Sequence, residues 1–508
     1  MDFASELRQG CQVLHPTSVA DVQAAVLAAR RERWKLYPVS TGHNWGYGSE
    51  CALPERHRRL DLSRMRRILN AERISRAEPV AVIEPGVTQG QLHGFLAQSH
   101  PDLMFNVTGS ACETSLIGNA LDRGVGYLGP RRDDLFGLEV VTGAGEVIRT
   151  GFRRLGDESP LAHCHPFGLG PMLDGLFFQG NFGVVTSACF RLMPRPPCMV
   201  AVSLALREGG QLGRFIDVLA ELKRERIMGS VTHVGNQART RASLSYGIAD
   251  YLQQRCGLAG DTLAAAAEHA LGVVAPFEWT SLGGISGTRA QVKAALAEVK
   301  RRMAGLARIN VVDDAKLDKG FKVLHPLGRW LPWARANAAA IAAIRPLHGL
   351  ASGAPTDAAV DNLLWRYGRS DLAAEQLDES NCGVIYISPA LPMDGVFVAD
   401  VISAMTAITA EFGMQLYVTI NIETENSLVA ISNLLFDRAS ATESAQARAC
   451  ADRLHAYVRS RGLEVYRARV DMMSAVVDAA SPYWQAVAAL KRALDPDEII
   501  APGRYNIC

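Results

Sequence analysis

The feature that most constrains the fold of this chain is a series of glycine-rich turns between strand-like segments in its first 190 residues. The turns have the sequences VSTGHNWGYG (39–48), EPGVTQGQL (84–92), SLIGNALDRGVGYLGP (115–130), TGAGEV (142–147) and FFQGNFGVVT (177–186). Glycine has no Cβ atom, so backbone N–H groups in such turns can approach a phosphate closely. Because the chain has neither a Walker motif nor a Rossmann G-x-G-x-x-G motif, the turns indicate either another type of nucleotide site or ordinary hairpins.

The organisation of the chain changes near residue 200. Residues 18–30 have helical spacing of apolar residues after a serine cap, and a strand-like LYPV follows at 36–39. Beyond the linker-like LMPRPP (192–197), strands alternate with long alanine-rich helices, for example over 289–308 and 334–344. These patterns predict two domains, and 508 residues are enough to give each a buried core.

Composition excludes several classes of protein. The formal charge of +1 and a hydrophobic fraction of 48% are typical of a globular protein that binds neither nucleic acid nor a membrane surface. The N-terminal stretch has no apolar segment of signal-peptide length, and no apolar run is long enough to span a bilayer, so we expect a cytoplasmic protein. Ten scattered cysteines form no C-x-x-C pair, and the histidines of LAHCHPFG (161–168) have no evident third ligand. We therefore predict neither a disulfide scaffold nor a metal site.

The ordered motifs VSTGHNWGYG, VIEPGVTQGQL, GSACETSLIGNALDRGVGY, GLEVVTGAGEVIRTG and GLFFQGNFGVVTSACFRLMP resemble the FAD-binding domain of the vanillyl-alcohol oxidase and p-cresol methylhydroxylase flavoproteins. The final LDPDEIIAPGRYNI is similar to that family's C-terminal return to the flavin domain. The resemblance implies an α+β fold with FAD as the cofactor. It divides the chain into a first part of the FAD-binding domain (1–205), a substrate or cap domain of sheet and helices (206–460) and the C-terminal return (461–508).

The resemblance also implies which residues surround FAD. The run 40–48 would offer N–H groups to the two phosphates, the glycines of 118–126 would leave bare backbone beside the cofactor, and 179–186 would line the flavin ring. The cofactor-binding residues expected in addition to two attachment residues are Ser40, Thr41, Gly42, Asn44, Trp45, Gly46, Thr114, Gly118, Asn119, Gly124, Asn181, Gly183, Val184 and Arg504.

Two residues match flavin-attachment positions of the berberine-bridge branch of this superfamily. His43 follows Gly42 as in the branch whose histidine bonds the flavin 8α-methyl carbon, and Cys112 aligns with the cysteine that bonds flavin C6. We therefore hypothesise a doubly linked flavin. The alternatives are that both residues make only non-covalent contacts, or that a cap tyrosine, Tyr367, Tyr386 or Tyr417, carries the link.

Catalytic roles follow from the same resemblance. Tyr466 and Arg467 match the Tyr-Arg pair that holds a phenolate, and Asp133, or equally Asp134, lies near the family's flavin-proximal aspartate. Where phenol-oxidising members are expected to place a second phenolate-binding tyrosine, four residues before the glutamate of E-P-G, this chain has Val80.

Other carboxylates belong to the cap. Glu423 and Glu425, in NIETEN, alternate on a predicted strand and so share a face. They are either a carboxylate pair of the cap or solvated strand residues.

We expect an FAD-dependent oxidase or dehydrogenase that removes a hydride from a benzylic or similar carbon of a phenolic metabolite. The reduced flavin would be reoxidised by oxygen or by a separate electron-acceptor protein, and the resemblance implies a homodimer. The alternatives are oxidation of a non-phenolic alcohol or amine, and a flavin-dependent cyclase or isomerase.

Overall fold

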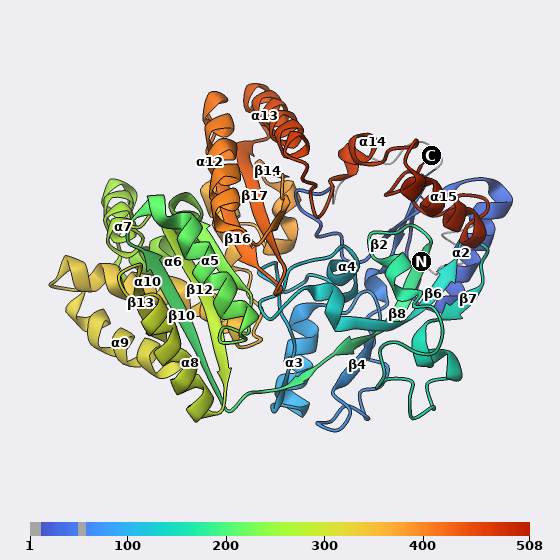
Figure 1. Cartoon of the computed structure of the whole chain (residues 1–508), viewed down its shortest axis with the longest axis horizontal. Helices are drawn as coiled ribbons and strands as arrows, with labels where there is room; N and C mark the ends of the chain where they lie inside the picture. Colours follow the sequence, from blue (N-terminus) through green and yellow to red (C-terminus); the bar gives the residue numbers. More distant parts are fainter. Residues whose placement is uncertain (1–11, 49–56, 508) are drawn as a thin grey trace.

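The computed structural model describes residues 12–48 and 57–507. The expectation about a leader concerns residues 1–11, which lie outside the described ranges. The chain forms a mixed helix-and-sheet molecule of two parts, which lie side by side in Figure 1. The predicted α+β fold class is confirmed.

The FAD-binding part begins with a small parallel sheet in the order β1-β3-β2, made of β1 (Val13–Leu14), β3 (His57–Asp61) and β2 (Lys35–Val39). Helix α2 (Val19–Glu32) covers this sheet, and the Ser18 hydroxyl caps it by accepting a hydrogen bond from the Asp21 N–H. Val22 and Val26 of α2 are buried, as the helical spacing predicted, whereas Val19 is half-buried and Leu27 is 48% exposed.

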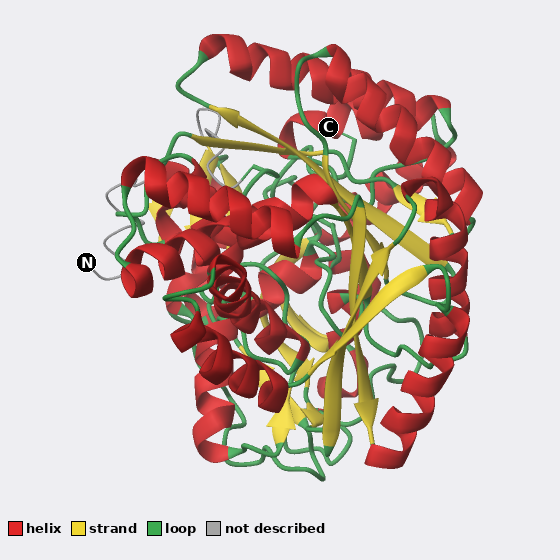
Figure 2. Ribbon diagram, turned by 90° about the vertical axis from the view of Figure 1, so that its left-hand side faces the viewer, coloured by secondary structure: helices red, strands yellow, loops and turns green. Residues whose placement is uncertain are grey.

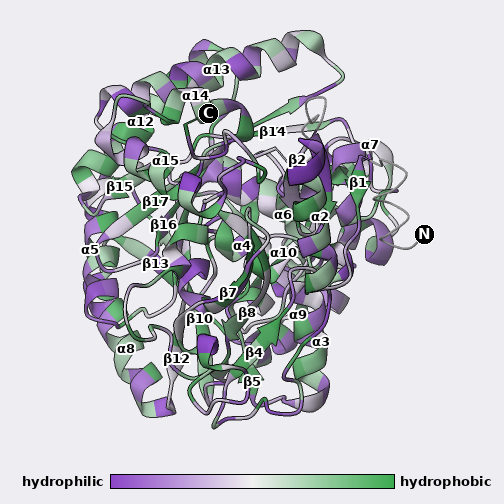
Figure 3. Cartoon of the chain, turned by 90° about the vertical axis from the view of Figure 1, so that its right-hand side faces the viewer, coloured by the Kyte–Doolittle hydropathy of each residue, from purple (hydrophilic) through white to green (hydrophobic). Residues whose placement is uncertain are grey.

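A second sheet of this part is antiparallel, in the order β4-β8-β6-β7. Its strands are β4 (Val80–Ile83), β8 (Gly183–Arg191), β6 (Leu135–Thr142) and β7 (Val147–Arg149). β8 and β4 run through the apolar interior seen in Figure 3, where they pack beside α3 (Gln89–Ser99) and α4 (Leu116–Leu121). A short pair, β5 (Leu103–Met104) with β9 (Met193–Pro194), lies at its margin.

The cap is built on an eight-stranded sheet in the order β13-β10-β12-β11-β16-β17-β14, with β15 also paired to β17. The bounds are β10 (Cys198–Leu206), β11 (Thr232–Asn236), β12 (Trp279–Gly287), β13 (Ala307–Val312), β14 (Cys382–Tyr386), β15 (Ala390–Pro392), β16 (Tyr417–Ile422) and β17 (Ser427–Asp437). β10 pairs with β12 and β13, so residues 198–205 belong to the cap. The expected boundary at 205/206 is therefore corrected to about 197/198, directly after the proline-rich linker.

Helices cover both faces of the cap sheet (Figure 2). One face buries the largest apolar cluster under α5 (Leu212–Arg224), α8 (Arg289–Arg302), α12 (Gly395–Glu411) and α13 (Ala441–Ser460). The other face meets α6 (Gln237–Cys256), with α7 (Gly260–Val274), α9 (Asp314–Leu327), α10 (Pro332–Ala351) and α11 (Ala358–Arg366) outside it. Helix α8 ends at Arg302, earlier than expected, because Gly305 makes a left-handed turn into β13.

After α13 the chain returns to the FAD-binding part through α14 (Met473–Val476) and α15 (Pro482–Leu494). Leu36 of β2 exchanges backbone hydrogen bonds with Ile499 and Ala501. The last residues thereby extend the small parallel sheet, some 460 residues after it begins.

Candidate functional site

A cleft of the FAD-binding part, with a volume of about 250 Å³, opens between the glycine turns. The loop after β2, the start of α4, the start of β8 and the C-terminal return all contribute to its wall. Thirteen of the predicted site residues line it: Ser40, Thr41, Gly42, His43, Asn44, Thr114, Gly118, Asn119, Asn181, Gly183, Val184, Arg467 and Arg504.

The two main glycine turns are bonded to each other. The Ser115 N–H donates to Thr41 Oγ1 (3.1 Å), while the Ser115 hydroxyl accepts from the Gly118 N–H at the start of α4 (2.9 Å). A Cβ atom on Gly118 would lie 2.3 Å from Ser40 Oγ, so the turns approach this closely only because residue 118 is glycine. This contact shapes the floor of the cleft.

Gly124 makes room for a neighbouring side chain. It does not line the cleft, and the space of its absent Cβ is taken by the Asn119 side-chain amide, 2.2 Å away. The absence of a Cβ atom at Gly124 lets the Asn119 side chain pack against the backbone, and contact of Gly124 with the cofactor stays a prediction.

Charged side chains meet at one end of the cleft. Arg467 pairs with Asp122 (2.5 Å) and donates to Asn44 Oδ1, and Arg504 lies 3.9 Å from Asp122. Burial on its own would lower the pKa of Arg467, but Asp122 and the neighbouring tyrosines raise it above its ordinary value. Asp122, in the GNALDRG run, was not singled out from the sequence. Its position directly after the short helix α4 gave no signal that it would meet two distant arginines.

Tyrosines surround Arg467 on the cap side. Its guanidinium lies 4.1 Å from the ring centre of Tyr47, and that ring stacks on Tyr386 of β14 at 4.8 Å and 3°. Burial raises the pKa of the adjacent Tyr466 to about 12, against the opposing effect of Arg467. Tyr47 was part of the quoted glycine run but received no role from the sequence, because only folding brings it beside Tyr466.

Val80 lies elsewhere. It is buried in a small cluster with Val82, Phe136 and Cys189 within the antiparallel sheet. The tyrosine that neighbours Tyr466 is Tyr47.

Only one of the two expected attachment residues lines the cleft. His43 lines the cleft, its ring stacks on Trp45 at 4.9 Å, and its Nδ1 lies 3.2 Å from the Glu113 carbonyl oxygen. Cys112 does not line the cleft; its N–H donates to Asp357 Oδ1 at 2.6 Å. Burial and Asp357 raise the pKa of the Cys112 thiol to about 12, which disfavours the reactive thiolate. Both links stay predictions, and this environment works against the second.

Three further predicted residues lie outside the cleft. Trp45 packs in a cluster with cap residues, and Gly46 meets the Tyr386 ring where its Cβ would be. Asp133 stands on the short helix η2 (Arg131–Asp134) with a carboxylate that is 59% exposed and pairs with Arg132. Its neighbour Asp134 is buried, accepts from Asn106 Nδ2 and has a pKa raised by burial to about 7.

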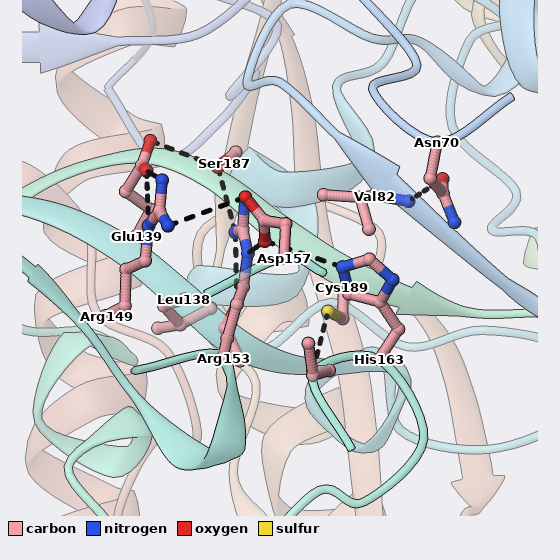
Figure 4. Close-up of polar contacts among 12 residues, drawn as sticks. Asn70, Val82, Leu138, Glu139, Arg149, Arg153, Asp157, His163, Ser187 and Cys189 are labelled. Atoms are coloured by element: carbon pink, nitrogen blue, oxygen red, sulfur yellow. Dashed lines mark hydrogen bonds and ion pairs between the residues drawn. The ribbon is translucent and has the colours of Figure 1, made fainter. Parts of the chain in front are cut away.

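His163, the first histidine of the LAHCHPFG segment, belongs to a structural network in the FAD-binding part (Figure 4). His163 is 3% exposed, with Nδ1 3.1 Å from Glu78 and Nε2 3.5 Å from Asp157. Arg153, also buried, donates to Asp157 and to Ser187. Across residues 12–48 and 57–507, no group of three or more His, Cys, Asp or Glu side chains has a metal-binding arrangement. Nor does any helix of these ranges have the length and apolarity needed to span a bilayer.

The cleft fits FAD chemically. Four buried polar atoms of lining residues have no partner among the described residues: Thr114 Oγ1, Asn119 Oδ1, Arg467 Nε and Arg504 Nη1. Buried polar atoms are rarely left without partners, so these atoms indicate a polar ligand. A ligand with phosphates, hydroxyls and a heteroaromatic ring satisfies such a mixture of arginine donors, hydroxyl and amide.

Comparison with known proteins agrees with this reading. Residues 12–151 match the FAD binding domain family. The chain is 30% identical to 1'-carboxy-chondrochloren decarboxylase of Chondromyces crocatus, over 97% of this chain and 90% of that protein. It is 26% identical to the 4-cresol dehydrogenase (hydroxylating) flavoprotein subunit of Pseudomonas putida, over 97% of this chain and 87% of that protein. The structure of 4-ethylphenol oxidase from Gulosibacter chungangensis in complex with isoeugenol superposes on this chain with a TM-score of 0.79 at 25% sequence identity. The superposition covers 97% of this chain and 89% of that protein.

Fold and cleft together define an FAD-dependent oxidoreductase with an FAD-binding part and a cap. More narrowly, the chain belongs to the vanillyl-alcohol oxidase and p-cresol methylhydroxylase family of flavoproteins.

Proposed function

We propose that this enzyme oxidises the alkyl side chain of a phenolic substrate, whose oxygen is held by Arg467, Tyr466 and Tyr47. The observation that carries the proposal is the Arg467 guanidinium, 4.1 Å from the Tyr47 ring centre and beside the Tyr466 hydroxyl. An arginine and tyrosine hydroxyls stabilise a phenolate by charge-assisted hydrogen bonds. The names of two relatives, a 4-cresol dehydrogenase and a 4-ethylphenol oxidase, support the same class of substrate.

The chemistry follows from holding the phenolate. Negative charge on the oxygen pushes electron density to the para position, which assists loss of hydride from the benzylic carbon. Bound FAD supplies the two-electron acceptor for that hydride. Loss of hydride leaves a p-quinone methide, to which water adds or from which a proton is lost. Arg467 and the tyrosines orient the ring throughout, since the oxygen returns to phenolate when the ring becomes aromatic again.

We also propose that His43 is the attachment point of the flavin, with Cys112 as a second link. His43 lies in the wall of the cleft that would hold the cofactor, which supports the first link. The reduced flavin would pass its electrons to oxygen or to a separate acceptor protein, and two copies of the chain would pair, in the cytoplasm. The second relative is a flavoprotein subunit, which supports a separate acceptor.

The test is anaerobic titration of the purified flavoprotein with 4-alkylphenols, followed by flavin absorbance. We expect 4-ethylphenol to bleach the flavin and its methyl ether, which cannot ionise, to leave it oxidised. Equal bleaching by the ether, or none by any 4-alkylphenol, would refute phenolate-assisted oxidation.

A second candidate is oxidative decarboxylation of a phenolic substrate whose side chain carries a carboxylate. Arg239 of α6 makes no ion pair with any residue of the described ranges, and its positive charge influences the pKa values of Tyr127, His233 and Tyr386. An arginine without a carboxylate partner suits an anionic substrate group. The relative of 30% identity is named a decarboxylase. Release of carbon dioxide from a carboxylated 4-alkylphenol, lost in Arg239→Ala while 4-ethylphenol oxidation persists, would establish this activity.

A further inference from the structure

Glu423 directly follows β16 at the boundary between the cap and the FAD-binding part. Ile420 and Ile422 of this strand point into the main apolar core of the cap. Side chains of a strand alternate between faces, so Asn421 lies on the opposite face and Glu423 continues its row. Asn421 Oδ1 accepts a hydrogen bond from His233 Nδ1 (2.8 Å), and the His233 ring contacts Tyr127 of the FAD-binding part, with ring centres 4.5 Å apart. Glu423 therefore belongs to the face of the cap that meets the flavin domain.

Glu423 is half-buried, and one oxygen of its carboxylate is enclosed without a hydrogen-bond partner among the described residues. Its Oε1 atom is inaccessible to solvent and makes no hydrogen bond with any residue between 12 and 48 or between 57 and 507. Glu425, two residues later, is a useful contrast, because it is 49% exposed and lies 4.0 Å from Arg226 on the surface. An unpaired buried carboxylate is costly, and such groups are usually kept for a ligand or a reaction.

The charges that face Glu423 come from three elements. Arg132 and Asp133 approach from η2, Lys223 approaches from α5, and the hydroxyl of Tyr466 lies on the returning C-terminal segment. Burial raises the pKa of Glu423 to about 7, against the opposing charges of Arg132 and Lys223 and with a further increase from Asp133. A carboxylate of this kind exchanges a proton near neutral pH, which suits a general base.

We propose that Glu423 is the general base that receives the proton when water adds to the oxidised side chain of the substrate. The proposal rests on the proposed function, in which oxidation of the benzylic carbon leaves a p-quinone methide. The water oxygen forms a bond to that carbon, and one water proton passes to the Glu423 carboxylate. The π pair of the exocyclic C=C bond returns to the ring, which restores the phenolate held by Arg467 and Tyr466.

Glu423 fits this role better than Asp133, which the resemblance placed, equally with Asp134, near the family's flavin-proximal aspartate. The Asp133 carboxylate is 59% exposed and already pairs with Arg132, whereas Oε1 of Glu423 is buried and unpaired. Glu423 also interacts electrostatically with both η2 and Tyr466, the group that would hold the other end of the substrate. A base at this point reaches water on the cap side of the ring.

The experiment uses stopped-flow mixing of the oxygen-free flavoprotein with 4-ethylphenol. Flavin bleaching reports hydride loss, and absorbance of the quinone methide reports the step assigned to Glu423. In Glu423→Gln we expect bleaching within about twofold of the parent and quinone-methide decay slowed about 100-fold. The parent decay rate should rise with pH through about 7 and become independent of pH in the variant. Glu423→Asp should restore part of the pH dependence, and Glu425→Gln should behave as the parent.

Product stereochemistry gives a readout that a structural role would not change. A base that directs water to one face yields mainly one enantiomer of 1-(4-hydroxyphenyl)ethanol, whereas quinone methide released to solvent yields a racemate. We expect a racemate from Glu423→Gln and one enantiomer from the parent and from Glu425→Gln. Infrared difference spectra without substrate should show a carboxylic-acid band that titrates near pH 7 and is missing in Glu423→Gln.

The outcomes separate the two proposals. If no 4-alkylphenol bleaches the parent flavin, the proposed function fails, and no quinone methide forms to which Glu423 could direct water. If the parent is bleached but Glu423→Gln keeps the parent decay rate, pH profile and enantiomer, the assignment of Glu423 is overturned and the proposed function stands.

Discussion

In the candidate site, the Arg467 guanidinium makes three contacts at the same time. It pairs with Asp122, contacts Asn44 and covers the Tyr47 ring, an arrangement that needs a planar group with several donors. Lysine presents a single compact charge and cannot reproduce it.

Arg467→Lys should therefore lower kcat/KM for 4-ethylphenol about 100-fold, the scale of losing an oriented donor to a developing oxyanion. Flavin content and thermal midpoint should change little, because the positive charge beside Asp122 is kept. Steady-state kinetics with flavin absorbance per chain provides the measurement. A variant as active as the parent would remove Arg467 from phenolate binding.

Tyr47 is the residue that only the structure brings to this place. Tyr47→Phe keeps the ring stacked on Tyr386 and under Arg467 but removes the hydroxyl next to Tyr466. We expect about a tenfold loss of kcat/KM, as for one hydrogen bond to a charged group. Tyr483→Phe is the matched control, since Tyr483 is 67% exposed and should have no effect. The assignment fails if the two variants are indistinguishable.

Among the elements, the two joined glycine turns determine the shape of the cleft. Gly118→Ala should destabilise the protein by about 1–3 kcal/mol, because the new methyl group would meet Ser40 Oγ at 2.3 Å. It should also lower the amount of FAD incorporated per chain, since residue 118 lines the cleft. Thermal unfolding and flavin absorbance per chain measure the two effects.

Gly94, in the interior of α3, is the control for that substitution, because nothing lies within 4 Å of its absent Cβ. Gly94→Ala should stabilise the protein by about 0.5–1 kcal/mol through helix propensity alone. Equal effects of the two alanines would show that the contact between Gly118 and Ser40 does not matter.

The C-terminal return depends on one buried ion pair. The Lys491 Nζ, in α15, pairs with Asp495 (2.6 Å) and donates to the Ile500 carbonyl oxygen and to that of Asn181, beside the cleft. Lys491→Met should cost about 3–5 kcal/mol, because it leaves Asp495 buried without a counter-charge. Lys491→Met/Asp495→Asn should recover part of this loss in urea unfolding. A single variant as stable as the parent would contradict the assigned role of the pair.

Across the whole molecule, the site is assembled from segments far apart in the chain. The returning segment touches both parts, since the Tyr466 N–H donates to the Ser388 carbonyl oxygen in the cap and the Val470 N–H donates to that of Tyr47. The cofactor cleft and the tyrosine cluster thus depend on cap, FAD-binding part and C-terminal return together.

The covalent state of the flavin is a property of the whole protein that mass spectrometry can measure after denaturation. We expect a mass increased by one FAD, with flavin on the peptide that contains His43. Cys112→Ala should keep this mass and His43→Ala should reduce the flavin to the Cys112 link, if that link forms. Bare-chain mass in the parent would contradict both links and leave His43 as a polar contact.

The sequence was sufficient for the class of fold and the cofactor through the family resemblance that its ordered motifs carry. The five glycine turns and the α2 pattern depend on neighbouring residues, because glycine permits close backbone approach and apolar spacing selects one helix face. For the same reason thirteen of the predicted residues, His43 and Gly118 among them, line one cleft.

Contacts between distant segments decided the rest. Nothing near Tyr47 in the sequence indicates that it would lie under Arg467, some 420 residues later. Burial likewise separates Glu423 from Glu425, which look alike on the strand pattern, because protonation depends on what surrounds a carboxylate in space. Periodicity and turns are set by residues a few positions apart, whereas the placement and charge of reactive groups are set by packing across the whole chain.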